Sequence, residues 1–192
     1  MKLILITVVG LVVGLMVACE AEQSGQKQSL KEAIKDTAQE SVDKQAEREA
    51  TYLSDIDPIA DSYYASKMFY TSELLRIGEK ARNATSDQEL LEAYEEIIAL
   101  FEILADGFRQ DWSDLRSVSP APRFKEFHLL LIDAIGDTKE STQAFLTAYS
   151  MALNSGVEDE DLASRASDLH KSANEKSLEA AYMYEELCPE CD

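Results

Sequence analysis

The sequence predicts an all-α protein: an antiparallel up-down-up-down four-helix bundle that follows a signal peptide and a tether. Apolar residues recur every three or four positions through residues 57–188, which is the spacing of amphipathic helices. Valine, which strands favour, is scarce beyond the signal peptide and occurs there only as Val42, Val118 and Val157. With seven Gly and four Pro in 192 residues, the chain has few of the turn residues that a β fold needs. The alternative fold is a three-helix bundle with one helix swapped or splayed.

The first 19 residues predict a targeting signal rather than part of the fold. Met1 and Lys2 give a positive start, and residues 3–17 form an apolar run. That run is shorter than the roughly 20 residues that a membrane-spanning helix needs. It ends at Ala18, directly before Cys19. An ordinary secretory signal peptide with a chance cysteine is the alternative interpretation.

A small residue before a cysteine, at the end of such a run, resembles the lipobox of bacterial lipoprotein precursors. In that family the Cys thiol receives a diacylglyceryl group, and signal peptidase II then cuts before it. The resemblance implies that residues 1–18 are removed and that Cys19 carries a covalent lipid. It departs at Met16, where the family usually has Leu. It also implies attachment to the extracytoplasmic face of the cell membrane, where two or more acyl chains give stable anchoring.

Residues 19–56 are expected to be the lipidated N-terminus and a tether that is partly helical. Residues 20–28 have no large apolar side chain, so they cannot bury enough surface to order themselves. In residues 29–50 an apolar residue recurs every fourth position, which indicates a helix with a thin apolar stripe. Such a helix is marginal on its own in water. We favour a loosely attached helix, and a helix docked on the domain is the alternative.

The bundle domain is predicted over residues 57–192, with its first helix beginning at Asp57-Pro58. Asp is a good N-cap, and Pro at the first helical position leaves no intrahelical hydrogen bond unmade. The second helix is expected to begin at Ser86, because its spacing from Glu89 is that of a capping box. Its apolar stripe comprises Leu90, Tyr94, Ile97, Phe101, Leu104, Phe108, Trp112 and Leu115.

The third and fourth helices are delimited by breaks in the apolar pattern. Residues 117–122, with two prolines, separate the second helix from the third. Residues 154–156 form a C-cap sequence that ends in Gly. Four acids at residues 158–161 suit the positive N-terminus of the last helix, and Pro189 ends it. Short connections between long helices favour antiparallel neighbours.

The first candidate for chemistry is His128, which lies on the apolar stripe of the third helix. The break centres near Pro120, so antiparallel folding places His128 level with Asp111 and Trp112. We expect a buried or half-buried His128 that hydrogen-bonds Asp111. A core histidine is favoured over a proton site or a ligand contact. The run from Trp112 through Pro120 and Pro122 to His128 loosely resembles uncharacterised all-α lipoproteins of Gram-positive bacteria, a resemblance that implies no activity.

The second candidate is the C-x-x-C pair Cys188 and Cys191. A thioredoxin-like redox site would follow a strand and open a helix, whereas this pair follows a predicted helix. A structural zinc site would need two further ligands at a suitable spacing. In an exported protein we expect a local disulfide between Cys188 and Cys191. Intermolecular pairing and metal capture are the alternatives.

No metal site, catalytic constellation or further cofactor is expected. The sequence has no Glu-x-x-His motif of the kind that carboxylate-bridged di-metal sites use. His170 falls level with Thr142 and does not stand four residues from another His, as a zincin helix requires. The acidic clusters at residues 89–96 and 158–161 lack the alternating acids and Gly of a calcium loop.

The formal net charge of −19 argues against nucleic-acid binding, because a phosphate backbone attracts a basic surface. We expect a membrane-anchored extracytoplasmic lipoprotein that acts as a non-enzymatic binding or structural module at the cell envelope. Its expected partners are the membrane, through the lipid, and an unidentified protein or cationic partner. One alternative is a redox or metal-handling protein that uses the C-terminal Cys pair. The other is an acidic scavenger or inhibitor of cationic proteins.

Overall fold

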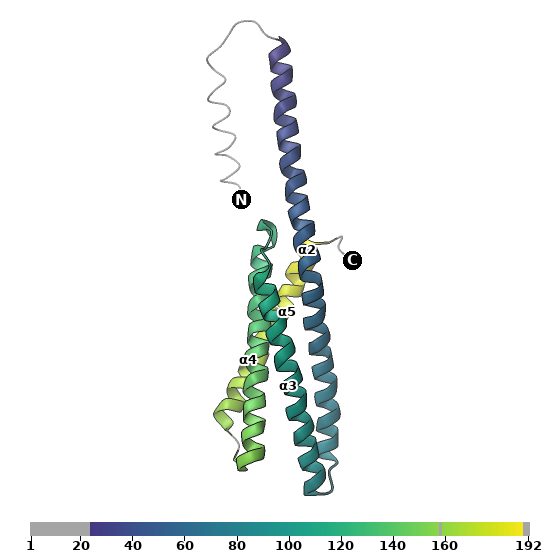
Figure 1. Cartoon of the computed structure of the whole chain (residues 1–192), viewed down its shortest axis with the longest axis vertical. Helices are drawn as coiled ribbons and strands as arrows, with labels where there is room; N and C mark the ends of the chain where they lie inside the picture. The colour runs from purple at the N-terminus through teal and green to yellow at the C-terminus, as the bar shows by residue number, and fades with distance from the viewer. Residues whose placement is uncertain (1–23, 158, 190–192) are drawn as a thin grey trace. The chain divides into compact units, whose positions relative to one another are not determined.

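The computed structural model of the chain describes residues 24–157 and 159–189, with side chains from residue 35 on except at residue 37. All regular structure in these residues is helical (Figure 1). The elements are α2 (Ser24–Arg82), α3 (Asp87–Ser117), the 3₁₀ turn η1 (Pro122–Phe124), α4 (Lys125–Ser155) and α5 (Glu160–Leu187). The all-α class and the four-helix bundle are therefore confirmed. The predicted signal peptide and the lipidation site Cys19 lie outside the described residues.

The chain divides into two units, residues 1–44 and residues 45–192. In the first unit, residues 24–44 are helical and every side chain described there is exposed. Pairs four residues apart support this helix: Gln39 Nε2 donates to Asp43 Oδ1 at 2.9 Å, and Lys44 Nζ donates to Glu40 Oε1 at 2.6 Å. Within the described residues, no helix combines the length and the apolar character needed to span a bilayer.

The helix that was predicted to begin at Asp57 begins instead at Ser24, so Pro58 lies inside α2. A proline there removes one intrahelical hydrogen bond, which is why the sequence favoured a helix start. Packing compensates for that loss. Tyr52 and Ile56, on the N-terminal side of Pro58, are only 2% and 1% exposed. The second compact unit accordingly begins well before Asp57, and residues of the predicted tether are part of its core.

Aromatic side chains fill the core of the second unit and link its helices. Tyr63 of α2 meets Phe108 of α3 edge-on, with ring centroids 5.8 Å apart. Phe101 of α3 stacks on Phe145 and Tyr149 of α4 at 5.5 and 5.7 Å. Leucine, isoleucine and alanine side chains form one buried cluster with Tyr63 and Phe108. Burial of this apolar surface is the main stabilising contribution to the fold.

The helix ends agree with the local sequence. The Ser86 hydroxyl accepts the Glu89 N–H at 3.2 Å, as the capping box predicted. Gly156 caps α4 with a φ of 68°, in the left-handed region that favours glycine. Asp159 caps α5 by accepting the Leu162 N–H at 2.9 Å. These caps fix where α3 and α5 begin and where α4 ends.

Candidate functional site

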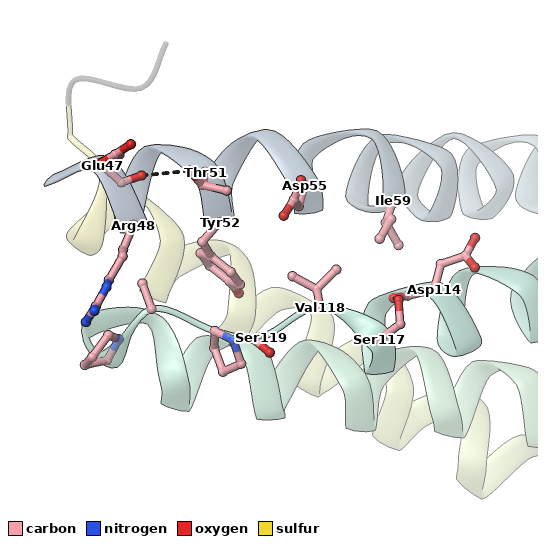
Figure 2. A pocket seen from close by; sticks show the side chains of 13 residues that line it. Glu47, Arg48, Thr51, Tyr52, Asp55, Ile59, Asp114, Ser117, Val118 and Ser119 are labelled. Atoms are coloured by element: carbon pink, nitrogen blue, oxygen red, sulfur yellow. Dashed lines mark hydrogen bonds between the residues drawn. The ribbon is translucent and has the colours of Figure 1, made fainter. Parts of the chain in front are cut away.

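An open groove of about 1100 Å³ lies where α2 passes the connection between α3 and α4 (Figure 2). One wall is α2 and the other is the end of α3 with the chain that follows it. Thirteen residues line the groove: Glu47, Arg48, Thr51, Tyr52, Asp55, Ile59, Asp114, Ser117, Val118, Ser119, Pro120, Ala121 and Pro122. We call this feature the basal groove.

The α2 wall follows from helical periodicity. Arg48, Tyr52, Asp55 and Ile59 are spaced by three and four residues and therefore share one face of the helix. Figure 2 shows the side chains of Arg48, Tyr52 and Ile59 turned toward the facing chain. Tyr52 is buried, whereas Asp55 remains exposed. This single face thus supplies both an apolar floor and a charged rim.

The opposite wall is built by chain that leaves the helical conformation. α3 ends at Ser117, and Val118 and Ala121 have extended backbone. Pro120 and Pro122 have no N–H, so this segment cannot continue the helical hydrogen bonding of α3. Arg123, next to Pro122, lies 3.5 Å from Glu49 of α2, between Nη1 and Oε2. That ion pair links η1 to α2.

The floor of the basal groove is Tyr52, which also reaches into the core. Its ring packs on Phe124 with centroids 5.3 Å apart. Its hydroxyl shares a hydrogen bond of 3.2 Å with His128 Nδ1. Burial lowers the pKa of His128 and raises the pKa of Tyr52, so both groups are held neutral near pH 7. In a neutral imidazole, Nδ1 can accept the hydrogen bond that the phenol O–H donates.

The rim of the basal groove carries an excess of negative charge. Glu47, Asp55 and Asp114 contribute three carboxylates, and Arg48 is the one basic residue in the lining. Gln110 Nε2 donates to Asp114 Oδ1 at 2.7 Å. Across the described part of the chain, none of the three carboxylates forms an ion pair with a basic side chain. They are therefore available to a cationic ligand.

His128 and Asp111 are both buried, at 3% and 6% exposure, but they contact different partners. His128 bonds Tyr52, whereas the hydrogen bond to Asp111 comes from Ser62. The second carboxylate oxygen of Asp111 has no partner among the described atoms, and burial raises the pKa of this carboxyl group. The hydrogen bond that the sequence predicted between His128 and Asp111 is thus replaced by separate contacts to α2.

The difference arises from the connection between α3 and α4. Trp112 was expected level with His128, but it lies against Gly136, where an added Cβ would be 3.3 Å from the indole Nε1. The segment from Val118 to Ala121 advances roughly 3.3 Å per extended residue, or about 13 Å, the rise of about nine helical residues. The first residue of α4 consequently lies farther along the bundle axis than the last residue of α3. The residues of α4 that face α3 are therefore not those expected for a tight turn at Pro120.

The other predicted site residues lie apart from the basal groove. Cys188 is the C-cap residue of α5 and forms a disulfide, while the predicted partner Cys191 lies outside the described residues. His170 is half-buried beside Tyr70, with ring centroids 5.7 Å apart. Burial, and then the charge of Lys67, lower the pKa of His170. Within the residues that the structure describes, His, Cys, Asp and Glu form no group of three suited to a metal ion.

One buried polar network was not expected from the sequence. The Tyr63 hydroxyl lies 2.8 Å from both Thr138 Oγ1 and Ser177 Oγ, and Lys67 Nζ donates to Ser177 Oγ at 3.1 Å. Burial lowers the pKa of Lys67 to about 8. Tyr63, Thr138 and Ser177 are all buried, so the network joins α2, α4 and α5 rather than presenting a surface.

Sequence reasoning also missed the basal groove, because its α2 wall falls in the segment that was assigned to the tether. Tyr52 was the available signal. A large aromatic residue is out of place in a solvated tether, and its i+4 neighbour is the apolar Ile56.

Comparison of the chain with protein-family models, with curated proteins and with solved structures returns no match.

Proposed function

We propose that this chain is a lipid-anchored protein of the extracytoplasmic membrane face that acts as a non-enzymatic binding module, and that the basal groove binds a basic segment of a partner protein. The observation that carries the proposal is the rim of Glu47, Asp55 and Asp114 around an open groove of about 1100 Å³. Charge complementarity of this kind selects cationic partners and accelerates their association.

The composition of the lining favours binding over catalysis. The thirteen residues of the basal groove include no His, Cys or Lys. The hydroxyl of Ser117 is engaged locally, since it donates to the Asp114 carbonyl at 2.6 Å. Nucleophilic catalysis needs a nucleophile beside a base that is itself oriented by a third group. Carboxylates above an apolar floor suit recognition of an extended basic peptide instead.

The proposed topology of the module is an up-down-up-down antiparallel bundle. The order of the side-chain contacts supports it. Tyr63 of α2 contacts Phe108 of α3, and further along α2 Tyr70 contacts Phe101, earlier in α3. The same reversal of order holds between α3 and α4 and between α4 and α5. Long helices with short connections favour this arrangement.

Anchoring through Cys19 rests on the sequence of residues 16–19 and is tested separately. Mass spectrometry of the protein purified from bacterial membranes is expected to give an N-terminal Cys19 with acyl chains. An intact residue 1 or a free Cys19 thiol would overturn the anchoring proposal. It would leave the proposal for the basal groove unaffected.

The basal groove is tested by calorimetric titration of the full chain with a basic peptide, acetyl-(Lys-Ala)₅, and with its acidic counterpart, acetyl-(Glu-Ala)₅. We expect binding of the basic peptide only, weakening as salt is raised. The variant Asp55→Asn/Asp114→Asn should bind it roughly tenfold more weakly, because two exposed charge pairs are lost.

The matched control is Glu102→Gln/Glu179→Gln, which removes the same charge from exposed positions outside the basal groove. We expect this control to bind as the wild type does. Equal weakening of peptide binding in the two double variants would overturn the proposal that the basal groove is the binding site. It would favour instead an acidic scavenger that attracts cationic proteins through its overall charge of −19.

A further inference from the structure

A second hollow, of about 230 Å³, lies between α3, the C-terminal half of α4 and the first turn of α5. Aromatic rings and carboxylates line it together: Tyr94, Phe145, Tyr149, Asp159 and Glu160, with three alanines. It is more enclosed than the basal groove and lies toward the other end of α3. We call it the aromatic hollow.

The aromatic rings line the hollow and do not fill it by stacking on one another. The planes of Tyr94 and Tyr149 meet at 59°, with centroids 6.0 Å apart, so the two rings form a corner. Phe145 lies 6.5 Å from Tyr149 and is held from behind by stacking on Phe101 at 5.5 Å. Tyr149 stacks on Phe101 as well. The rings of Phe145 and Tyr149 are therefore fixed by core packing before any ligand arrives.

Two carboxylates complete the lining. Asp159 is half-buried and fixed in place, because its Oδ1 accepts the Leu162 N–H at 2.9 Å. Glu160 follows in the first turn of α5 and is exposed. In the described part of the chain, neither carboxylate pairs with a basic side chain. Acids at a helix N-terminus stabilise the helix on their own account. What sets this place apart is that the same two acids line a hollow walled by three aromatic rings.

We propose that the aromatic hollow binds a small organic cation of the quaternary-ammonium class. Aromatic faces attract a cation through the ring quadrupole, and the effect is strongest when the cation is largely stripped of water. A quaternary ammonium has no N–H to satisfy, so a lining of rings and methyl groups costs it little. At about 30 Å³ per water molecule, the space equals some seven or eight waters, which suits a trimethylammonium group with a short chain.

The lining also distinguishes this class from other cations. A primary ammonium is compact and strongly hydrated, and it would need several oxygen acceptors to replace its water. A divalent metal ion prefers a shell of oxygen ligands, which walls of aromatic rings and methyl groups do not supply. A neutral molecule would leave the two charges without a partner. The proposal stands apart from that for the basal groove, with which the aromatic hollow shares no residue.

The test uses the full chain, with choline as the probe and 3,3-dimethylbutan-1-ol as its uncharged isostere. Binding is followed by calorimetry and by NMR saturation transfer from the probe's methyl groups. We expect choline to bind at least tenfold more tightly than the neutral isostere, which corresponds to about 1.4 kcal/mol of charge-dependent binding. Absence of choline binding, or equal binding of the two probes, would overturn the proposal.

Variants place the binding at the hollow. Asp159→Asn/Glu160→Gln removes both charges while Asn still caps α5, and it should weaken choline binding about tenfold. The matched control is Asp161→Asn/Asp168→Asn, on the same helix and outside the hollow, which should bind as the wild type does. Tyr94→Phe should keep the affinity and Tyr94→Leu should lose it. If all of these variants bind choline equally well, the site lies elsewhere and the assignment is wrong.

Discussion

The hydroxyl of Tyr52 and Nδ1 of His128 lie 3.2 Å apart, and this hydrogen bond joins a residue of the predicted tether to the first turn of α4. Both side chains are buried, at 2% and 3% exposure. A buried polar atom that loses its partner costs more than the bond itself contributes. This contact therefore helps to hold the stretch of α2 that directly precedes Pro58 within the second unit.

Replacing Tyr52 with Phe should destabilise the protein by about 1–2 kcal/mol, because the imidazole nitrogen keeps its burial and loses its partner. The ring contact with Phe124 is retained, so the change isolates the hydrogen bond. Urea denaturation followed by circular dichroism measures the effect. Tyr182→Phe, at a position 59% exposed, is the control and should be neutral. Equal stability of the two variants would mean that the Tyr52 hydroxyl contributes nothing.

Stability should fall as the pH drops below about 6.5, the ordinary pKa of histidine. Burial lowers the pKa of His128 in the folded state, so in this window the unfolded chain takes up a proton that the folded chain does not. The unfolded state is then favoured by acid, with a slope of at most about 1.4 kcal/mol per pH unit for one group. Burial also lowers the pKa of His170, which adds in the same direction.

The variants His128→Gln and His170→Gln separate the two contributions. Urea denaturation at pH 7.5 and 5.5 should show a smaller loss of stability on acidification in each variant than in the wild type. Asp111 acts in the opposite direction, since burial raises the pKa of its carboxyl group and the folded chain therefore takes up that proton more readily than the unfolded chain. An unchanged pH dependence in His128→Gln would show that this imidazole titrates as it does in the unfolded chain.

Two glycines give opposite expectations for substitution by alanine. Gly78, inside α2, has no atom within 4 Å of an added Cβ, so Gly78→Ala should stabilise the protein by about 0.5–1 kcal/mol through helix propensity. At Gly136 an added Cβ would lie 3.3 Å from Trp112 Nε1, so the indole must shift and the gain should disappear. Trp112 is the single tryptophan, and its fluorescence should change in Gly136→Ala alone. A gain at Gly136 equal to that at Gly78, with unchanged fluorescence, would contradict the close approach.

Pro58→Ala should stabilise the protein by about 1–3 kcal/mol, because it restores an intrahelical hydrogen bond inside α2 and removes a ring that crowds the preceding turn. The measurement is the free energy of unfolding from urea denaturation. Had the helix begun at Asp57, proline would be favourable at this position and its removal would be neutral or harmful. A neutral or destabilising result would thus restore the boundary that the sequence indicated.

Local patterns predicted the helices well, because apolar periodicity and caps act over a few residues. Ser86 with Glu89, and Gly156 after α4, were both readable from neighbours in the chain. Pro58 was misjudged since its tolerance depends on the burial of Tyr52 and Ile56, which is a tertiary effect. The residues of α3 and α4 that face each other could likewise not be predicted from local patterns. The length of an extended connection moved Trp112 from His128 to Gly136, and no spacing within the helices reports that length.

Tyr52 is at once the floor of the basal groove and the partner of a buried imidazole. Ligand occupancy and proton uptake therefore share a side chain, and thermodynamic linkage makes their influence reciprocal. A ligand of the proposed site that strengthened the hydrogen bond between Tyr52 and His128 would make His128 harder to protonate, and protonation of His128 would weaken the binding of that ligand by the same factor.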